Sequence, residues 1–225
     1  MTPPPRTLVF DLDGTLIHSA PDLAAALNKV LTDADRDPVT LDQVTRMIGD
    51  GVAVLVERGF AATGGAPDDP GHHLDRFHHH YNNAAADLTT LYPGVMDTLH
   101  ALTEAGYRMA LCTNKPARAT AAVLDAFGLA GFFEAVAGGD TFAVRKPSPG
   151  HLLGLLKRMD ADPEHAVMIG DSPNDVRVAL NAAVPVIAVA YGYRRVPAED
   201  MGADILIEHF HQVPDALRRL GLAPA

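Results

Sequence analysis

Short apolar runs rich in β-forming residues recur along the chain, and segments with helical spacing lie between them. We expect strands at residues 7–10, 108–112, 166–170, 186–190 and 204–207, with a weaker sixth candidate at 134–138. Three intervening segments have Pro near the start: 93–105, 116–127 and 149–159. The first of them places Val95, Leu99 and Leu102 on one helical stripe. This alternation predicts an α/β fold in which a parallel sheet carries helices on both faces.

The stretch 17–88 interrupts the alternation. It contains no convincing strand, and apolar residues such as Leu23 and Leu27 recur in it at helical spacing. We therefore expect a small α-helical domain within residues 17–88, inserted after the first strand. The core domain is then made of residues 1–16 and 89–225.

Composition restricts the partners that the chain can have. Its 225 residues carry 18 Lys and Arg against 28 Asp and Glu, and the formal net charge of −10 disfavours nucleic acid as a partner. An anionic substrate would need local cations or a metal ion to overcome this field. The longest uncharged run, 178–193, is short and interrupted by Asn, Pro and Gly, so no membrane partner is expected. With no signal-peptide pattern, we expect a cytoplasmic protein, either a monomer or a homodimer.

Two carboxylates directly follow the first expected strand. Asp11 and Asp13 lie two positions apart, and Gly14 permits a sharp turn where the chain leaves the strand. At one reacting centre, the first carboxylate can attack while the second gives and takes a proton. Taken alone, the same residues also fit a solvated acidic turn.

Three further polar motifs occur in loops of the expected sheet. They are Thr113-Asn114, Lys146, and the acidic pair Asp171 and Asp175. Separately, each motif also fits a strand end, a solvated turn or a helix cap. In open α/β sheets, ligands bind beyond the carboxyl ends of the strands, so the motifs together indicate one site.

In this order, the motifs resemble those of the haloacid dehalogenase (HAD) superfamily. The Asp-x-Asp-Gly-Thr signature of that superfamily matches residues 11–15, and its later motifs match Thr113, Lys146 and the acidic pair. The resemblance implies a Rossmann-like core with a helical cap inserted after the first motif. It also implies Mg²⁺ as the cofactor.

The resemblance assigns roles to these residues. It implies that Asp11 attacks phosphorus and forms an aspartyl-phosphate, while Asp13 protonates the leaving group and then activates water. Mg²⁺ is then held by Asp11, Asp171 and the backbone carbonyl of Asp13. Thr113 and the backbone amides near Leu12 and Asn114 donate to the phosphoryl group.

Two further roles follow from the same resemblance. Lys146 neutralises charge on the nucleophile and the transferring group, and Asp175 orients Lys146 or a metal-bound water from behind. Dehalogenases of this superfamily generally lack an Asp at the position of Asp13, because a halide leaves without a proton. The chain is therefore expected to hydrolyse phosphate esters.

Within the superfamily, the chain resembles the bacterial phosphoglycolate phosphatase group at residues 13–23, 48–52 and 92–95. This implies a small anionic phosphate ester as substrate, with 2-phosphoglycolate preferred. His18 departs from the Asp that the group commonly carries there, and it is either a substrate contact or a solvated linker residue. Another small phosphomonoester, a sugar phosphomutase reaction and a regulatory scaffold without catalysis are the alternatives.

A glycine-flanked loop in the helical segment is a candidate for substrate binding. The amides of Gly49, Asp50 and Gly51, with Arg46 one turn earlier, can bind a small carboxylate. A plain turn between helices is the competing interpretation. Whether Lys115 or Arg145 touches the substrate, or both are only flanking charges, is left open by the sequence.

Overall fold

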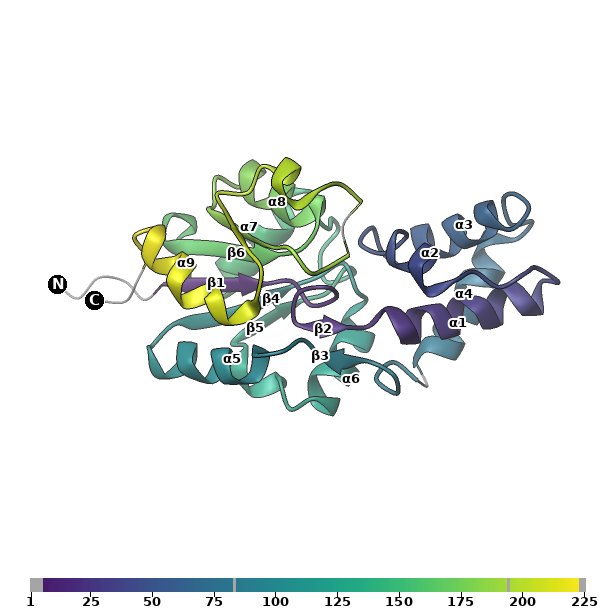
Figure 1. Ribbon diagram of the computed structural model, residues 1–225, viewed down its shortest axis with the longest axis horizontal. Helices are drawn as coiled ribbons and strands as arrows, with labels where there is room; N and C mark the ends of the chain where they lie inside the picture. Colours follow the sequence, from purple (N-terminus) through teal and green to yellow (C-terminus); the bar gives the residue numbers. More distant parts are fainter. Residues whose placement is uncertain (1–5, 83, 194, 223–225) are drawn as a thin grey trace.

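The computed structural model describes residues 6–82, 84–193 and 195–222. The ends of the expected core, residues 1–5 and 223–225, lie outside the described residues. Figure 1 shows a sheet flanked by helices and, beside it, a separate group of helices drawn in purple and blue.

One six-stranded sheet lies at the centre of the larger part, with strand order β5-β4-β1-β6-β7-β8, and every neighbouring pair is parallel. Its strands are β1 (Thr7–Phe10), β4 (Arg108–Cys112), β5 (Ala135–Ala137), β6 (Ala166–Gly170), β7 (Val186–Val189) and β8 (Ile205–Ile207). All six strands expected from the sequence are present, three of them shorter by one or two residues. The α/β, Rossmann-like fold class is thus confirmed.

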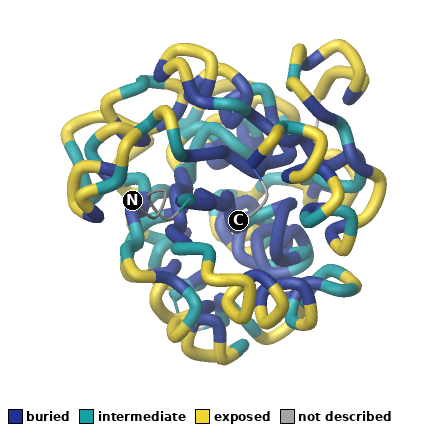
Figure 2. Tube along the Cα trace, turned by 90° about the vertical axis from the view of Figure 1, so that its left-hand side faces the viewer, coloured by how far each residue is buried: buried dark blue, intermediate teal, exposed yellow. Residues whose placement is uncertain are grey.

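Helices cover both faces of this sheet because alternate strand residues point to opposite sides. The helices are α5 (Val95–Glu104), α6 (Ala117–Ala126), α7 (Pro149–Arg158), α8 (Pro173–Asn181) and α9 (Val213–Arg219). Leu8 and Phe10 of β1 belong to one apolar cluster, with α5, α6 and α9, whereas Val9 belongs to a second cluster with α7 and α8. Short 3₁₀ turns are η1 (Ala130–Phe132), η2 (Pro163–His165), η3 (Ala198–Met201) and η4 (Phe210–Gln212). In Figure 2 buried segments, drawn in dark blue, run through the middle of the molecule, and exposed segments, drawn in yellow, lie mostly around them.

The stretch 17–88 is mainly helical, as expected. It forms α1 (Ala20–Asp33), α2 (Leu41–Thr45), α3 (Val52–Ala62) and α4 (Pro70–Asn82). The interpretation that it contains no strand needs a correction, because β2 (Ile17–His18) pairs antiparallel with β3 (Thr90–Leu91) where the chain leaves and re-enters the core. Two-residue strands have no readable periodicity, and their pairing depends on a partner far along the chain.

Asp22 fixes the junction between the two parts. Its side chain, which is only 3% exposed, accepts hydrogen bonds from the backbone amides of Leu88 (2.9 Å) and Thr89 (2.8 Å) and from the Thr89 hydroxyl (2.6 Å). Hydrogen bonds to a buried carboxylate are among the stronger ones. The start of α1 is therefore tied to the segment that returns to the sheet.

None of the described helices has the length and apolar content needed to cross a membrane.

Candidate active site

Three neighbouring strands place the polar motifs at one edge of the sheet. Because β4, β1 and β6 are adjacent and parallel, their carboxyl ends bring Thr113, Asp11 and Asp171 together. Gly14 turns the chain after β1 with φ +87°, and a Cβ there would collide with the Asp171 carboxylate. A side chain at this position would therefore both strain the backbone and push Asp171 out of place.

Three buried carboxylates lie around one buried ammonium. Oxygens of Asp11, Asp171 and Asp175 lie within 4.8 Å of one another. The Lys146 Nζ lies 2.8 Å from Asp11 Oδ1 and 2.6 Å from Asp175 Oδ1. One ammonium does not balance three carboxylates, so the cluster keeps an excess of negative charge.

Burial and the neighbouring carboxylates together raise the proton affinities of Asp11 and Asp171. Burial, with the charge of Asp175, raises the pKa of Asp11 to about 7 although Lys146 opposes the rise. Burial and the charges of Asp175 and Asp11 also raise the pKa of Asp171 well above its usual range. Burial disfavours the Lys146 ammonium, but Asp11 and Asp175 outweigh burial and raise the pKa of Lys146. An all-oxygen donor set with uncompensated charge fits a hard divalent cation such as Mg²⁺.

Asp175 serves as a support for the other residues of the cluster. Its Oδ2 accepts hydrogen bonds from the backbone amides of Asp171 (3.2 Å) and Ser172 (3.0 Å) and from the Ser172 hydroxyl (2.7 Å), while Oδ1 faces Lys146. Both oxygens are thus engaged. The helix-cap interpretation and the functional interpretation of Asp175 are both compatible with these contacts, since the same carboxylate caps α8 and holds Lys146.

Thr113 and Asn114 lie in the wall of a pocket beside this cluster. Thr113 is buried, and its Oγ1 accepts a hydrogen bond from the Lys115 amide at 3.2 Å. The Asn114 side chain donates to the carbonyls of Gly49 and Lys146, both at 3.0 Å. The side chain of Asn114 therefore ties a loop of the helical segment to the loop that carries Lys146.

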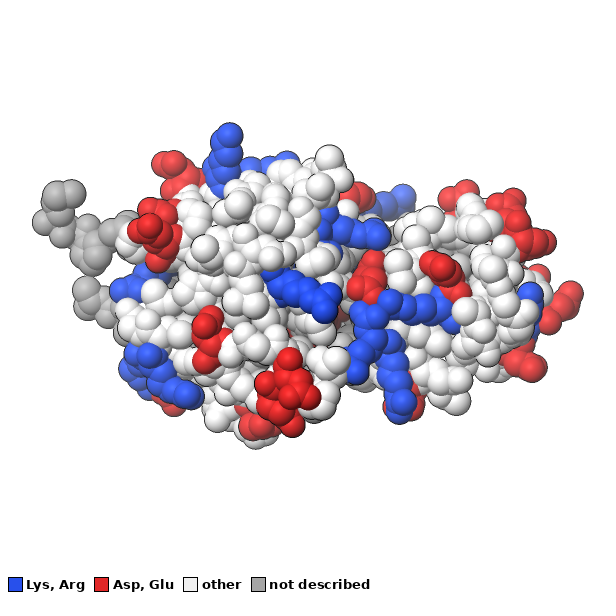
Figure 3. Space-filling view, turned by 90° about the horizontal axis from the view of Figure 1, so that it is seen from above, with Lys and Arg blue, Asp and Glu red and all other residues white. Residues whose placement is uncertain are grey.

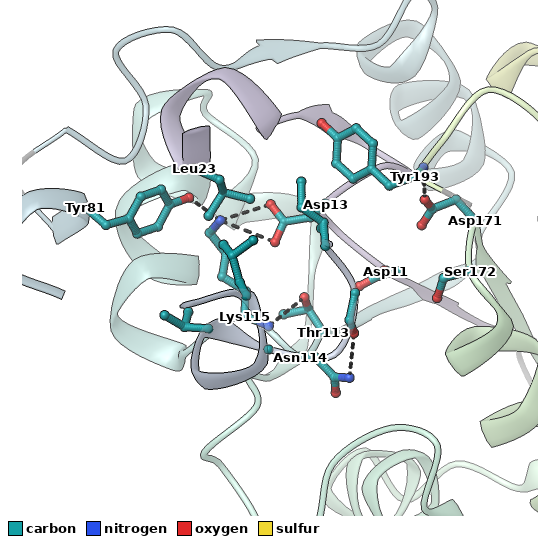
Figure 4. Close-up of a pocket in the computed structure, with 15 residues that line it drawn as sticks. Asp11, Asp13, Leu23, Tyr81, Thr113, Asn114, Lys115, Asp171, Ser172 and Tyr193 are labelled. Carbon is teal, nitrogen blue, oxygen red and sulfur yellow. Dashed lines mark hydrogen bonds and ion pairs between the residues drawn. The ribbon is translucent and has the colours of Figure 1, made fainter. Parts of the chain in front are cut away.

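Lys115 and Tyr81 form a second charged contact in the same pocket. Lys115, only 5% exposed, places its Nζ 2.9 Å from Oδ1 of Asp13. The same Nζ donates to the Tyr81 hydroxyl and lies 4.7 Å from the centre of the Tyr81 ring. Burial disfavours the ammonium, but Asp13 and Tyr81 outweigh burial and raise the pKa of Lys115. Figure 4 shows Lys115 between Asp13 of the core and Tyr81 of α4.

The pocket is lined from both parts of the molecule. The core contributes polar and charged side chains, whereas the helical segment contributes mostly apolar ones. The residues that line it are Asp11, Asp13, Leu23, Ile48, Gly49, Gly51, Val52, Leu55, Tyr81, Thr113, Asn114, Lys115, Asp171, Ser172 and Tyr193.

The loop at residues 49–51 reaches the core through Asp50. The Asp50 carboxylate accepts from Asn174 Nδ2 at 2.7 Å and pairs with Arg58 and Arg195, each at 2.5 Å. Burial alone would raise the pKa of Asp50, but these hydrogen bonds outweigh it and lower the pKa. Figure 3 shows basic and acidic side chains gathered where the two parts of the molecule meet.

Comparison with known proteins identifies the family. A family model for haloacid dehalogenase-like hydrolases matches residues 5–183. The chain belongs to this family. It is 42% identical to a phosphoglycolate phosphatase of Rhodospirillum rubrum, over 98% of this chain and 97% of that protein. It is 43% identical to a phosphoglycolate phosphatase of Caulobacter vibrioides, over 93% of this chain and 90% of the relative.

Solved structures agree with this assignment. The crystal structure of a predicted phosphoglycolate phosphatase from Haemophilus somnus has a TM-score of 0.89 and 30% identity, and the match covers 94% of this chain and 97% of that one. CbbY from Rhodobacter sphaeroides, solved in complex with phosphate, has a TM-score of 0.79 and 26% identity, covering 95% and 96%. The resemblance inferred from the motifs is confirmed, and this member of the HAD-like hydrolases is an enzyme, a phosphatase.

Two residues of this HAD-like hydrolase that were expected to bind substrate do not line the pocket. Arg46 is exposed and pairs with Asp42, one helical turn away, at 2.8 Å. His18 is half-buried, and its Nδ1 lies 2.9 Å from the hydroxyl of Tyr193, which does line the pocket. Of the glycine-flanked loop, Gly49 and Gly51 line the pocket, whereas the carboxylate of Asp50 faces other side chains.

Of the two residues in the second charged contact, sequence reasoning left the role of Lys115 open and missed Tyr81. Lys115 gave a weak signal, because it directly follows Thr113 and Asn114 at a strand end. Tyr81 gave no signal, since an aromatic residue on a helix usually belongs to the core. Tyr81 is only 1% exposed, which is typical of a core residue, and only the contact of its hydroxyl with Lys115 reveals the second role.

Proposed function

We propose that this HAD-like phosphatase hydrolyses 2-phosphoglycolate through an aspartyl-phosphate on Asp11, with Mg²⁺ as cofactor. The observation that carries the proposal is the buried cluster of Asp11, Asp171 and Asp175 around Lys146, at a pocket that Asp13 also lines. The names of the similar proteins support the choice of substrate.

The proposed reaction has two steps. In the first, an Asp11 carboxylate oxygen attacks phosphorus, the ester P–O bond breaks, and Asp13 gives its proton to the leaving glycolate oxygen. In the second, Asp13 takes a proton from water as the water oxygen attacks phosphorus, and the bond between phosphorus and Asp11 breaks. The products are glycolate and inorganic phosphate, and both aspartates regain their starting forms.

Charge compensation decides whether an anion can enter this site. Asp11 and Asp171, with the backbone carbonyl of Asp13, are the proposed Mg²⁺ ligands. When bound, Mg²⁺ would offset the charges of the carboxylates and of the phosphate. Lys146 favours the charged form of Asp11 and orients it through the 2.8 Å contact, and Asp175 fixes Lys146 from the other side. Thr113 and the amide of Asn114 are the proposed donors to the phosphoryl oxygens.

The apolar part of the wall favours a small substrate over a sugar phosphate. Leu23, Ile48, Val52 and Leu55 offer no hydrogen bonds, and a sugar has several hydroxyl groups that would lose water without gaining partners. Among the described lining residues of the helical segment, Tyr81 alone has a polar side chain. This composition disfavours a sugar phosphomutase, whose substrate must reorient within the site.

We further propose that residues 17–88 act as a cap that opens to admit substrate and closes to exclude water. The junction at β2 and β3 provides the two connections for such a motion, and the contacts of Asp50 with Asn174 and Arg195 lie on its closing face. The core then consists of residues 1–16 and 89–225.

Phosphate release from a panel of esters tests the proposal. The panel contains 2-phosphoglycolate, ethyl phosphate, glucose 1-phosphate and nucleotides, each with Mg²⁺ and with a chelator. We expect the highest kcat/KM for 2-phosphoglycolate, loss of turnover with the chelator, and no turnover by Asp11→Asn. A higher kcat/KM for a sugar phosphate, or turnover that survives in Asp11→Asn, would contradict the proposal.

A further inference from the structure

Lys115 is the one cation among the described residues that line the pocket. The ammonium of Lys146 is engaged by Asp11 and Asp175 behind the wall. Arg46, the cation expected to bind the substrate carboxylate, is exposed and paired with Asp42. Among the described residues of the wall, a second anionic group on a substrate, besides its phosphate, therefore finds a positive partner only at Lys115.

The contact between Lys115 and Asp13 determines how close the Lys115 ammonium lies to the leaving oxygen of the substrate. Lys115 Nζ lies 2.9 Å from Asp13 Oδ1. Since Asp13 must hydrogen-bond the leaving oxygen, that oxygen comes within about 6 Å of the ammonium. In 2-phosphoglycolate the carboxylate carbon is two bonds from this oxygen, so the carboxylate can reach the ammonium without leaving the pocket.

The Lys115 ammonium contacts both parts of the molecule, because Asp13 belongs to the core and Tyr81 to the helical segment. The ring of Tyr81 stacks on Phe77 of the same helix at 5.5 Å between centres, and Tyr81 is 1% exposed, so its hydroxyl is held firmly. That hydroxyl accepts from Lys115, leaving its own proton for another acceptor. A carboxylate has two acceptor oxygens, which match one ammonium and one hydroxyl.

Resting on the function proposed above, we propose that Lys115 and Tyr81 are the residues that select the substrate. Together they bind a carboxylate attached to the carbon next to the leaving oxygen. The substrate class is thereby phosphate esters of short 2-hydroxy acids. The four aliphatic residues of the cap wall limit the size of the group that this carbon can carry.

The competing interpretation is that Lys115 only neutralises and orients Asp13. The two interpretations differ in their substrate dependence. An ammonium that acts through Asp13 serves every ester equally, because each leaving oxygen needs the same proton. An ammonium that binds the carboxylate matters only for esters that have one.

The test compares 2-phosphoglycolate with ethyl phosphate, which has a methyl group in place of the carboxylate. We expect Lys115→Met to lower kcat/KM for 2-phosphoglycolate about 30-fold more than for ethyl phosphate, with this additional loss mainly in KM. A loss shared by both esters reports the contact of Lys115 with Asp13. Tyr81→Phe, which keeps the ring, should lower only the 2-phosphoglycolate value, by about 3- to 10-fold. Lys29→Met, the same change on the exposed face of α1, is the matched control and should alter neither value. Equal losses on both esters in Lys115→Met would overturn the proposal.

Binding measurements separate this proposal from the proposed reaction. Calorimetry with Asp11→Asn and with Asp11→Asn/Lys115→Met, in the presence of Mg²⁺, reports affinity without turnover. We expect the second variant to lose most of its preference for 2-phosphoglycolate over ethyl phosphate. If the preference survives, the inference about Lys115 is wrong, whatever the rate of hydrolysis. If wild-type protein binds 2-phosphoglycolate through Lys115 but never hydrolyses it, the proposed function alone is wrong.

Discussion

The two walls of the pocket differ in composition and in origin. The core wall comes from three adjacent strand ends and presents carboxylates, an ammonium and a hydroxyl, from Asp11, Asp13, Thr113, Lys115 and Asp171. The wall from the helical segment is aliphatic except for the Tyr81 hydroxyl and the backbone of the glycine loop. A rigid sheet positions groups for bond making, whereas an apolar cap wall controls size and water. We infer that the reaction is set by the core and the choice of substrate by the contact between the two walls.

The largest effect is expected from a change in the core wall. Asp11→Asn replaces the attacking oxygen with a weaker group of the same shape, and kcat for every phosphate ester should fall by roughly 10³-fold or more. Steady-state phosphate release measures this. A loss confined to 2-phosphoglycolate would break the assignment of chemistry to the core.

A smaller loss, on the order of 10²-fold in kcat/KM, is expected for Asp171→Asn through weaker metal binding. Mg²⁺ should also raise the Tm of wild-type protein and leave that of Asp171→Asn almost unchanged. Thermal unfolding with and without Mg²⁺ measures both. An equal Mg²⁺ effect on the two proteins would contradict the proposed ligand set.

The gain in Tm that Mg²⁺ produces should depend on pH. The pKa of Asp11 is raised from 3.8 to about 7, so its contribution to the stability of the metal-free fold is present below about pH 4 and is lost as pH rises to 7. Mg²⁺ binds the deprotonated carboxylates. The Tm gain from Mg²⁺ should therefore be larger at pH 8 than at pH 5, and the opposite order would contradict this explanation.

An intermediate effect is expected at the junction of the two walls. Asn174 donates to the Gly49 carbonyl at 3.1 Å and to Asp50 at 2.7 Å, and Asn174→Ala removes both contacts. We expect kcat/KM to fall by about 3- to 10-fold for 2-phosphoglycolate and ethyl phosphate alike, because closure serves any substrate. A loss on one ester alone would assign Asn174 to substrate selection instead.

The smallest effect is expected for Arg46→Ala. The side chains of Arg46 and Asp42 are 71% and 72% exposed, and an exposed pair of this kind contributes less than about 1 kcal/mol. Kinetic constants on both esters should stay within about twofold of wild type, since the pocket is untouched. A selective rise in KM for 2-phosphoglycolate would show that Arg46 reaches the substrate after all.

The same contrast explains what the sequence could predict. The core motifs follow apolar strands, and a parallel sheet gathers strand ends, so Asp11, Thr113 and Asp171 were expected to meet. In the structure these three residues line the same pocket. The contact of Tyr81 with Lys115 joins segments far apart in the chain, and no local pattern encodes it. Arg46 was chosen because it lies one turn from the glycine loop, but helix geometry directs it to solvent.

Small elements at the junction were also beyond local reasoning. The β2–β3 pair consists of two residues on each side, Ile17 with Leu91 and His18 with Thr90. Beside this pair, the buried Asp22 accepts hydrogen bonds from the amides of Leu88 and Thr89, and these contacts join segments that lie far apart in the sequence. Secondary-structure propensity and hydrophobic periodicity depend on residues close together in the sequence, so they do not predict such pairings.

Trapping of the intermediate tests the central claim most directly. Protein mixed with excess 2-phosphoglycolate and Mg²⁺ is quenched in acid within the first turnovers, and mass spectrometry of its peptides locates the phosphoryl group. The account predicts an acyl-phosphate on Asp11 that forms before steady state, and none in Asp11→Asn. A phosphoryl group on another residue, or glycolate released from protein whose Asp11 never carries phosphate, would contradict it.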